Sequence, residues 1–184
     1  MGTTKLHNAL LTGKGSAALA LIEAGGIDLN AQDDVGRTAL MLAAAQSFNK
    51  VVAKLLEKDV RTALTDKFNH TALEMARDGG NEEGRNMLYR RLGPAELQAE
   101  AIHAAREGDI DALRFLVDEM DVSLSAVSSR GKTVLEEAEV STQLDAAEWI
   151  EQKLADFPAK AGRDMHKGVN ASMKPLKKII FKNS

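Results

Sequence analysis

The residues most suggestive of chemistry lie near the N-terminus, where Gly13-Lys14-Gly15-Ser16 follows an apolar pair. Glycines beside a lysine and a hydroxyl are the residue types with which a P-loop cradles a nucleotide phosphate. A P-loop also needs a glycine five residues before its Gly-Lys pair, a hydroxyl directly after the lysine, and a preceding strand. Asn8 and Gly15 stand at the first two of these positions, and residues 4–11 have a helical pattern. The stretch therefore predicts a turn and not a nucleotide site.

No other residue pattern points to catalysis or to a bound cofactor. The chain has no cysteine, and no pair of its four histidines has the spacing of a zinc finger or a metalloprotease helix. Adjacent carboxylates are expected to be solvated, as on most charged proteins; these pairs are Asp33-Asp34, Glu82-Glu83 and Glu136-Glu137. We predict no catalytic, cofactor-binding or metal-binding residues and no enzyme activity. An enzyme on this scaffold would need a pocket where titratable groups converge.

The composition is that of an ordinary folded protein. Hydrophobic residues make up 44% and charged residues 28% of the 184 residues, which suits one domain, or two small ones, with a substantial core. Aromatic residues are only 4%, which favours closely packed helices with small side chains. No apolar run has the layout of a signal peptide or the length of a membrane span, so we expect a cytoplasmic protein.

The charge is distributed unevenly along the chain. Residues 157–184 contain seven Lys or Arg and one Asp, a net charge of +6, which leaves −9 for residues 1–156. Blocks of opposite sign often mark a tail that interacts with something. The tail could lie back on the acidic body, bind an acidic partner, a membrane surface or nucleic acid, or be disordered. The tail residues singled out for such contacts are Lys174, Lys177, Lys178 and Phe181.

An internal repeat of 33 or 34 residues runs through most of the chain. The stretches 33–45 and 66–78 align, with Asp, Thr and Ala at matching places. The threonine-type positions of successive units are Thr4, Thr38, Thr71, Ala99 and Thr133. An apolar residue or pair follows each of them at a distance of 17 residues, as in Leu55-Leu56. A repeat of this length predicts helical units that bury their apolar faces by stacking on one another.

The unit resembles the ankyrin repeat, which reads Asp-x-x-Gly-x-Thr-Pro-Leu-His-x-Ala-Ala, then a turn glycine and a second helix. The best match is IDLNAQDDVGRTALMLAAA, residues 27–45. The resemblance implies an all-α solenoid of about five helix–turn–helix units with short β-hairpin loops. We expect the units at 3–36, 37–69, 70–97, 98–131 and 132–156, so that residues 1–156 form the ankyrin-repeat domain. Residues 157–184 would then be an extended basic C-terminal tail.

The residue types at the turns and helix starts have physical reasons. Gly36 and Gly131 suit a loop that needs positive φ, and Asn69 takes that place in the third unit. Thr38, Thr71 and Thr133 are expected to cap the helices that follow them. In the repeat frame Gly13 is the turn glycine of the first unit, and Ser16 is placed to cap its second helix. His7 falls on the family's usual histidine position, which implies a structural hydrogen-bonding role.

Two units depart from the pattern. Only 28 residues separate Thr71 from Ala99, and the intervening segment lacks the hairpin loop. Pro94 suits the first position of a helix, so we expect a longer helix at about 95–106 and an irregular third unit that bends or notches the array. In the last unit Thr142 replaces the turn glycine, and residues 141–157 predict an amphipathic helix. Its apolar residues at near-helical spacing are Leu144, Ala147, Ile150 and Leu154, with Trp149 as a further packing residue.

The resemblance also implies where binding occurs, because ankyrin arrays grip other proteins with hairpin tips and inner helices on a concave face. Carried over to this chain, the binding residues are Asp34, Val35, Arg37, Ala45, Gln46, Lys67, Phe68, His70, Arg106, Ser129, Arg130 and Lys132. Phe68 is expected to be an exposed anchor, unless it folds onto the neighbouring loop. The basic tip residues favour an acidic partner surface. We predict a non-enzymatic protein–protein interaction module, monomeric on its own; the alternative is an electrostatic binder whose tail engages nucleic acid or an anionic membrane.

Overall fold

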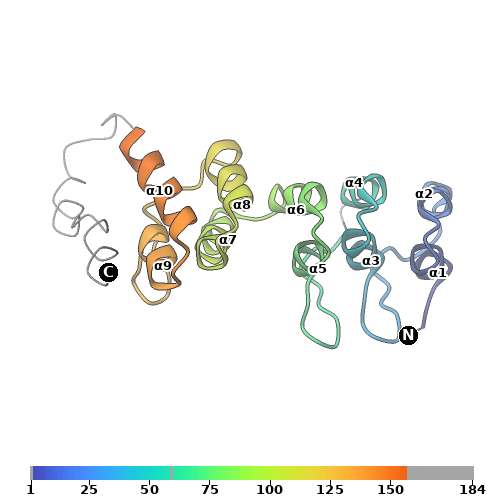
Figure 1. The fold of residues 1–184 in the computed structure, drawn as a ribbon. Helices are drawn as coiled ribbons and strands as arrows, with labels where there is room; N and C mark the ends of the chain where they lie inside the picture. Colours follow the sequence, from blue (N-terminus) through green and yellow to red (C-terminus); the bar gives the residue numbers. More distant parts are fainter. Residues whose placement is uncertain (1, 59, 157–184) are drawn as a thin grey trace, which may run out of the picture.

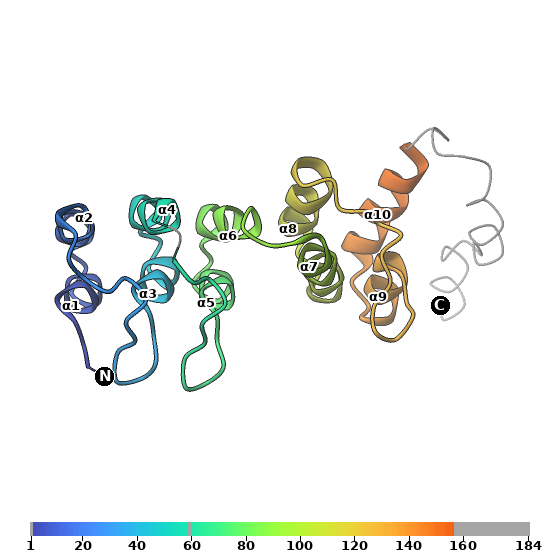
Figure 2. The same ribbon diagram turned by 180° about the vertical axis from the view of Figure 1, so that it is seen from behind.

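The computed structural model describes residues 2–58 and 60–156, which form ten α-helices and one π-helical segment. They are α1 (Lys5–Leu11), α2 (Gly15–Ala24), α3 (Ala39–Ala45), α4 (Asn49–Glu57), α5 (Ala72–Asp78), α6 (Glu82–Tyr89), α7 (Pro94–Glu107), α8 (Ile110–Arg114), η1 (Phe115–Glu119), α9 (Val134–Val140) and α10 (Leu144–Asp156). The helices form pairs that stand side by side in one row, with α1, α3, α5, α7 and α9 in an inner layer (Figures 1 and 2). The prediction of an all-α array of paired helices is confirmed. The predicted tail, 157–184, lies outside the described residues.

Three inner helices begin as predicted, with Thr38, Thr71 and Thr133 as caps, and α1 begins in the same way. Thr4, Thr38, Thr71 and Thr133 are the N-caps of α1, α3, α5 and α9, and each hydroxyl accepts a hydrogen bond from the N–H three residues later. The predicted positive φ is also present, at 88° for Gly36, 66° for Asn69 and 71° for Gly131. No strand forms in the described part of the chain. Two of the loops instead close with single antiparallel bridges, Gln32 with Thr38 and Val127 with Thr133.

The prediction that Ser16 caps α2 is wrong. Lys14 is the N-cap residue, no side chain caps this helix, and Ser16 lies within its first turn. The turn is closed by the backbone instead, since the Lys14 N–H donates to the Ala9 carbonyl at 2.8 Å. Gly13 has the expected positive φ of 74°, which confirms it as the turn glycine.

The buried apolar residues form two clusters that divide the row. The first runs from Leu6 to Leu88 and belongs to the first three helix pairs. The second runs from Tyr89 at the end of α6 to Ile150, and its other buried residues belong to the last two units. Alanines allow close packing of inner helices in both clusters. Five alanines of the inner helices are fully or almost fully buried: Ala43, Ala44, Ala76, Ala104 and Ala105.

The last helix buries less of its apolar face than its sequence predicts. Ala147 and Ile150 are buried, whereas Leu144 is 57% and Leu154 is 37% exposed. The reason is that α10 belongs to the last unit that the structure describes, so its neighbours in that part cover only one side. Trp149 is half-buried and packs against the second cluster, which confirms its packing role.

The joint between the two clusters lies where the hairpin is missing. Only residues 90–93 connect α6 to α7, and Pro94 is the first residue of α7, as predicted. Polar side chains bridge this joint, with ion pairs from Arg77 to Glu100 and from Arg85 to Asp109. The ring of Tyr89 stacks on that of Phe115, with 6.1 Å between the ring centres.

Candidate functional site

The first loop, residues 33–38, is organised by the carboxylate of Asp33. One carboxylate oxygen accepts hydrogen bonds from the N–H groups of Val35 and Arg37, at 2.9 and 2.8 Å. The other oxygen pairs with Nε and Nη2 of Arg37, at 2.9 and 2.8 Å. Burial alone would raise the pKa of Asp33, but the hydrogen bonds from Arg37 and Val35 outweigh it and hold the pKa below its ordinary value.

The second loop, residues 66–71, repeats this arrangement and presents an aromatic ring. Asp66 accepts hydrogen bonds from the N–H groups of Phe68 and His70, at 2.9 and 2.8 Å. Burial raises the pKa of Asp66, but these two hydrogen bonds lower it more, so that the net shift is downward. The Phe68 side chain is 69% exposed, and its ring centre lies 6.3 Å from that of His70. The aromatic ring at this loop tip is therefore exposed to solvent, while hydrogen bonds to Asp66 hold the loop backbone in place.

The third loop, residues 128–133, has a serine at the organising position. The Ser128 hydroxyl accepts hydrogen bonds from the N–H groups of Arg130 and Lys132, both at 3.3 Å. Sequence reasoning did not assign this organising role to Asp33, Asp66 or Ser128. The signal was present, because Asp and Ser commonly accept hydrogen bonds from backbone N–H groups a few residues later.

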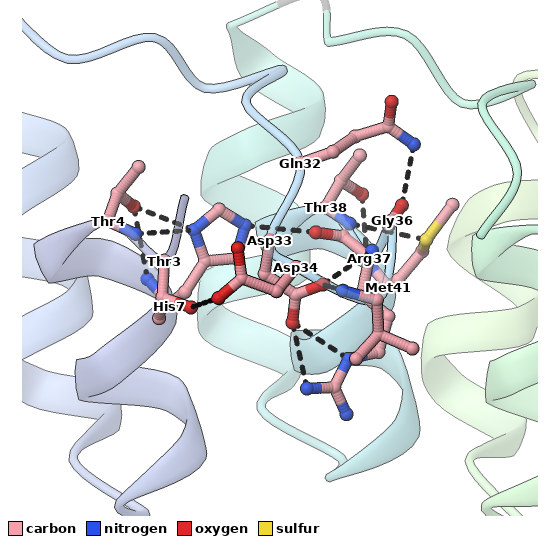
Figure 3. Close-up of polar contacts among 11 residues, drawn as sticks. Thr3, Thr4, His7, Gln32, Asp33, Asp34, Gly36, Arg37, Thr38 and Met41 are labelled. Atoms are coloured by element: carbon pink, nitrogen blue, oxygen red, sulfur yellow. Dashed lines mark hydrogen bonds and ion pairs between the residues drawn. The ribbon is translucent and has the colours of Figure 1, made fainter. Parts of the chain in front are cut away.

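The first loop is also hydrogen-bonded to neighbouring parts of the chain, and Figure 3 shows its contacts with the first unit. Nδ1 of His7 accepts a hydrogen bond from the Thr4 N–H, and Nε2 lies 3.0 Å from the Arg37 carbonyl oxygen. The Gln32 side-chain amide donates to the Gly36 and Thr65 carbonyls, at 2.6 and 2.9 Å. These contacts confirm the structural role of His7 and link the first loop to both adjacent units.

A buried carboxylate links the third loop to the inner helices. Glu137 on α9 is 1% exposed and accepts hydrogen bonds from Nε and Nη2 of Arg106 on α7, at 2.9 and 3.1 Å. Arg130 in the third loop lies 3.3 Å from the same carboxylate. The hydrogen bonds from Arg106 lower the pKa of Glu137 to about 2. Two of the adjacent carboxylates predicted to be solvated, Asp33 and Glu137, are therefore buried because arginines compensate their charge.

The repeated helix pairs and loops agree with the family that the sequence matches. The profile described as Ankyrin repeats (3 copies) matches residues 6–100. The chain belongs to the ankyrin-repeat family. It is also 25% identical, over 150 residues, to the ankyrin repeat and SAM domain-containing protein 6 of Danio rerio. The match covers 78% of this chain but spans only about a fifth, 20%, of that curated relative.

The ankyrin array brings together some of the predicted binding residues and separates others. The first two loops adjoin one another, since the Lys67 N–H donates to the Val35 carbonyl at 3.0 Å. The residues gathered there, with the end of α3 in the same units, are Asp34, Val35, Arg37, Ala45, Gln46, Lys67, Phe68 and His70. Arg106, Ser129, Arg130 and Lys132 belong to the last two units, beyond the joint that lacks a loop. The predicted surface is thus divided into two parts.

The positive charges of several predicted binding residues are paired with carboxylates of the protein itself. Arg37 pairs with buried Asp33, while Arg106 and Arg130 share buried Glu137. The Lys67 side chain, by contrast, is exposed. A role in partner binding remains a prediction for all of these residues.

The described residues offer no alternative site of the metal or membrane kind. In residues 2–58 and 60–156, no group of three or more His, Asp or Glu side chains is arranged to hold a metal ion. No helix in the same ranges combines the length and apolar character required to cross a bilayer. The predicted tail contacts through Lys174, Lys177, Lys178 and Phe181 fall outside these ranges.

Proposed function

We propose that the chain is a non-catalytic protein-binding module that grips its partner with the first two loop tips and the adjoining end of α3. Membership of the ankyrin family supports protein binding in general. The observation that carries the choice of surface is Phe68, whose large apolar side chain is 69% exposed. Exposed aromatic side chains of this kind form many of the hot spots of protein interfaces.

The loop that carries Phe68 is suited to binding because its backbone is already ordered. Asp66 accepts two hydrogen bonds within the loop, and Lys67 is bonded through its N–H to the first loop. A fixed loop loses little conformational entropy when a partner arrives, so more of the contact energy appears as affinity. Lys67 adjoins Phe68 in the chain, and its exposed ammonium favours an acidic partner surface.

The test is affinity capture with a matched pair of variants. Phe68→Ala should lose the partner, with a cost of about 2 kcal/mol, or roughly 30-fold in Kd, which is typical of a hot spot. Leu154→Ala removes another exposed apolar side chain far from the loops and should retain the partner. Arg37→Ala is a poor test, because it would also leave the buried Asp33 carboxylate without its charge partner. If both variants retain the same proteins as the parent chain, the loop tips are not the binding surface.

A further inference from the structure

The outer face of a unit is the side that would be covered by the unit that follows it in the array. The outer face of the last unit differs from that of the other units. Six residues after the threonine-type position, Leu10, Ala44 and Ala105 are fully buried by the unit that follows. The equivalent residue of the last unit is Glu139, which is exposed. Eighteen residues after the threonine-type position, four units have buried apolar side chains, namely Ile22, Leu56, Tyr89 and Val117. The last unit has exposed Glu151 there.

The third unit shows what happens when this position is charged inside the array. Its residue six positions after Thr71 is Arg77, which is half-buried. The guanidinium of Arg77 is paired with Glu100 from the next unit. A charge at this position is therefore compensated by an opposite charge on the segment that packs against it. By the same rule, a segment that covers Glu139 should carry positive charge.

The outer face combines negative charge with exposed apolar side chains. Val140 and Leu144 are each 57% exposed and are separated only by the turn 141–143. The pKa of Glu139 is raised above its ordinary value. Partial burial is the largest cause, and repulsion from Glu151 and Glu136 adds to it. The Glu139 carboxylate therefore lies close enough to those of Glu151 and Glu136 to be repelled by both, beside the exposed apolar side chains of Val140 and Leu144.

Charge and length single out one segment of the chain that fits this face. Residues 133–156 contain seven acidic residues and one lysine, a net charge of −6, and residues 157–184 have a net charge of +6. The segment 174–182, KPLKKIIFK, combines four lysines with Ile179, Ile180 and Phe181. It is separated from Asp156 by the 17 residues 157–173, which can span up to about 60 Å. The helix α10 is only about 20 Å long, so the segment can reach every part of the face.

We propose that residues 174–182 dock in the same molecule on the outer face of α9 and α10, with Lys177 and Lys178 against Glu139 and Glu151. The three apolar residues would cover Val140 and Leu144. The tail would then close the end of the array in place of a further repeat. Because the tail is tethered, even weak contacts are favoured by a high effective concentration.

The chain provides its own probes for a test. It has one tryptophan, Trp149 on α10, and no cysteine. Asn183→Cys in the full chain can therefore be labelled at one place with an energy acceptor for Trp149. We expect strong transfer at low salt, and a loss of about half or more of it near 1 M salt, where the Debye length is about 3 Å.

Three further variants of the labelled chain locate the contact. Glu139→Lys/Glu151→Lys should lower the transfer at low salt by about the same amount as 1 M salt. Adding Lys177→Glu/Lys178→Glu to it should restore most of the transfer, which a misfolded chain would not allow. Glu23→Lys/Glu82→Lys makes the same charge change at exposed residues of the first and third units and should leave transfer unchanged.

Three results would overturn the proposal. Transfer that is insensitive to Glu139→Lys/Glu151→Lys would show that the tail is elsewhere. An equal loss in the Glu23→Lys/Glu82→Lys control would show a general charge effect without a docking site. Transfer that rises with protein concentration, and falls when labelled chain is diluted with unlabelled chain, would show that the tail binds a second copy.

Discussion

The first three units and the last two are held together by different means. In the first three, hydrogen bonds cross from unit to unit, as when the buried Asn81 side chain donates to the Ala44 carbonyl and the Asn49 amide donates to the Glu83 carboxylate. In the last two, arginine–carboxylate pairs do this work, with Arg106 and Arg130 both on Glu137. The joint between the two regions, where the loop is missing, also depends on ion pairs. Loss of one hairpin thus coincides with a change from hydrogen bonds to ion pairs between units.

The largest expected effects come from truncating matched core residues on the two sides of the joint. Leu55 and Leu116 occupy equivalent repeat positions and are both fully buried. Replacing either with alanine should cost about 2–5 kcal/mol, because it removes buried methyl groups and leaves a cavity. In urea unfolding, Leu116→Ala should shift the fluorescence transition of Trp149 more than Leu55→Ala does, since Trp149 belongs to the last unit.

The same pair of variants tests whether the two regions unfold independently. Far-UV circular dichroism follows helices on both sides of the joint and provides the second probe. If the two regions unfold separately, Leu55→Ala should lower the urea midpoint of the dichroism transition below that of the Trp149 transition. Coincident transitions in both variants would show that the charged joint couples the array into one cooperative unit.

A smaller difference is expected between the loop organisers. Asp33→Ala removes the acceptor of two backbone N–H groups and the partner of Arg37, and should cost about 1–3 kcal/mol. Ser128→Ala removes two longer contacts of 3.3 Å and should cost about 0.5–1.5 kcal/mol. Thermal unfolding followed by circular dichroism measures both. A larger cost for Ser128→Ala would mean that the third loop is the more firmly held.

The sequence predicts the repeated parts of this molecule well and the compensated charges poorly. Repeat spacing located the threonine caps and the positive-φ positions because those features depend on local geometry. Ser16 was wrongly assigned as the cap because a backbone hydrogen bond closes that turn at Lys14, two residues earlier. Burial of Glu137 depends on Arg106, which lies 31 residues away, so no local pattern announces it.

The chain's loop-tip surface shows the same limit. Local repeat position was enough to predict that Phe68 lies at a loop tip, where it is exposed. It could not show that the guanidinium of Arg37 is occupied by Asp33, because both residues also look like free surface charges in the sequence. Repeat position therefore predicts which side chains lie at the loop tips, but not which of their charges are paired inside the protein.

Acid should distinguish the two regions through Glu137. Its pKa in the folded chain is about 2, below the ordinary value of 4.5, so its contribution to stability is fully present above about pH 4.5. That contribution should be lost as the pH falls from 4.5 through about 2, because protonation weakens the hydrogen bonds from Arg106. The urea midpoint reported by Trp149 measures it, as the difference between the parent chain and Glu137→Gln. The difference should shrink over this pH range, and a constant difference would mean that Glu137 stabilises by packing alone.

The smallest effect concerns the turn glycine that two units lack. Thr142 has φ of 60° and Ser47 has φ of 57°, in the place where other units have glycine. A left-handed residue with a Cβ costs about 1–2 kcal/mol, while glycine adds about 0.4–1 kcal/mol of unfolded-chain entropy. Thr142→Gly should therefore stabilise the last unit by about 0.5–1 kcal/mol, and Ser47→Gly should give less, because serine is not β-branched. Since Trp149 reports the last unit, its midpoint should rise with Thr142→Gly and hardly move with Ser47→Gly; an equal rise in both would contradict the independence of the two regions.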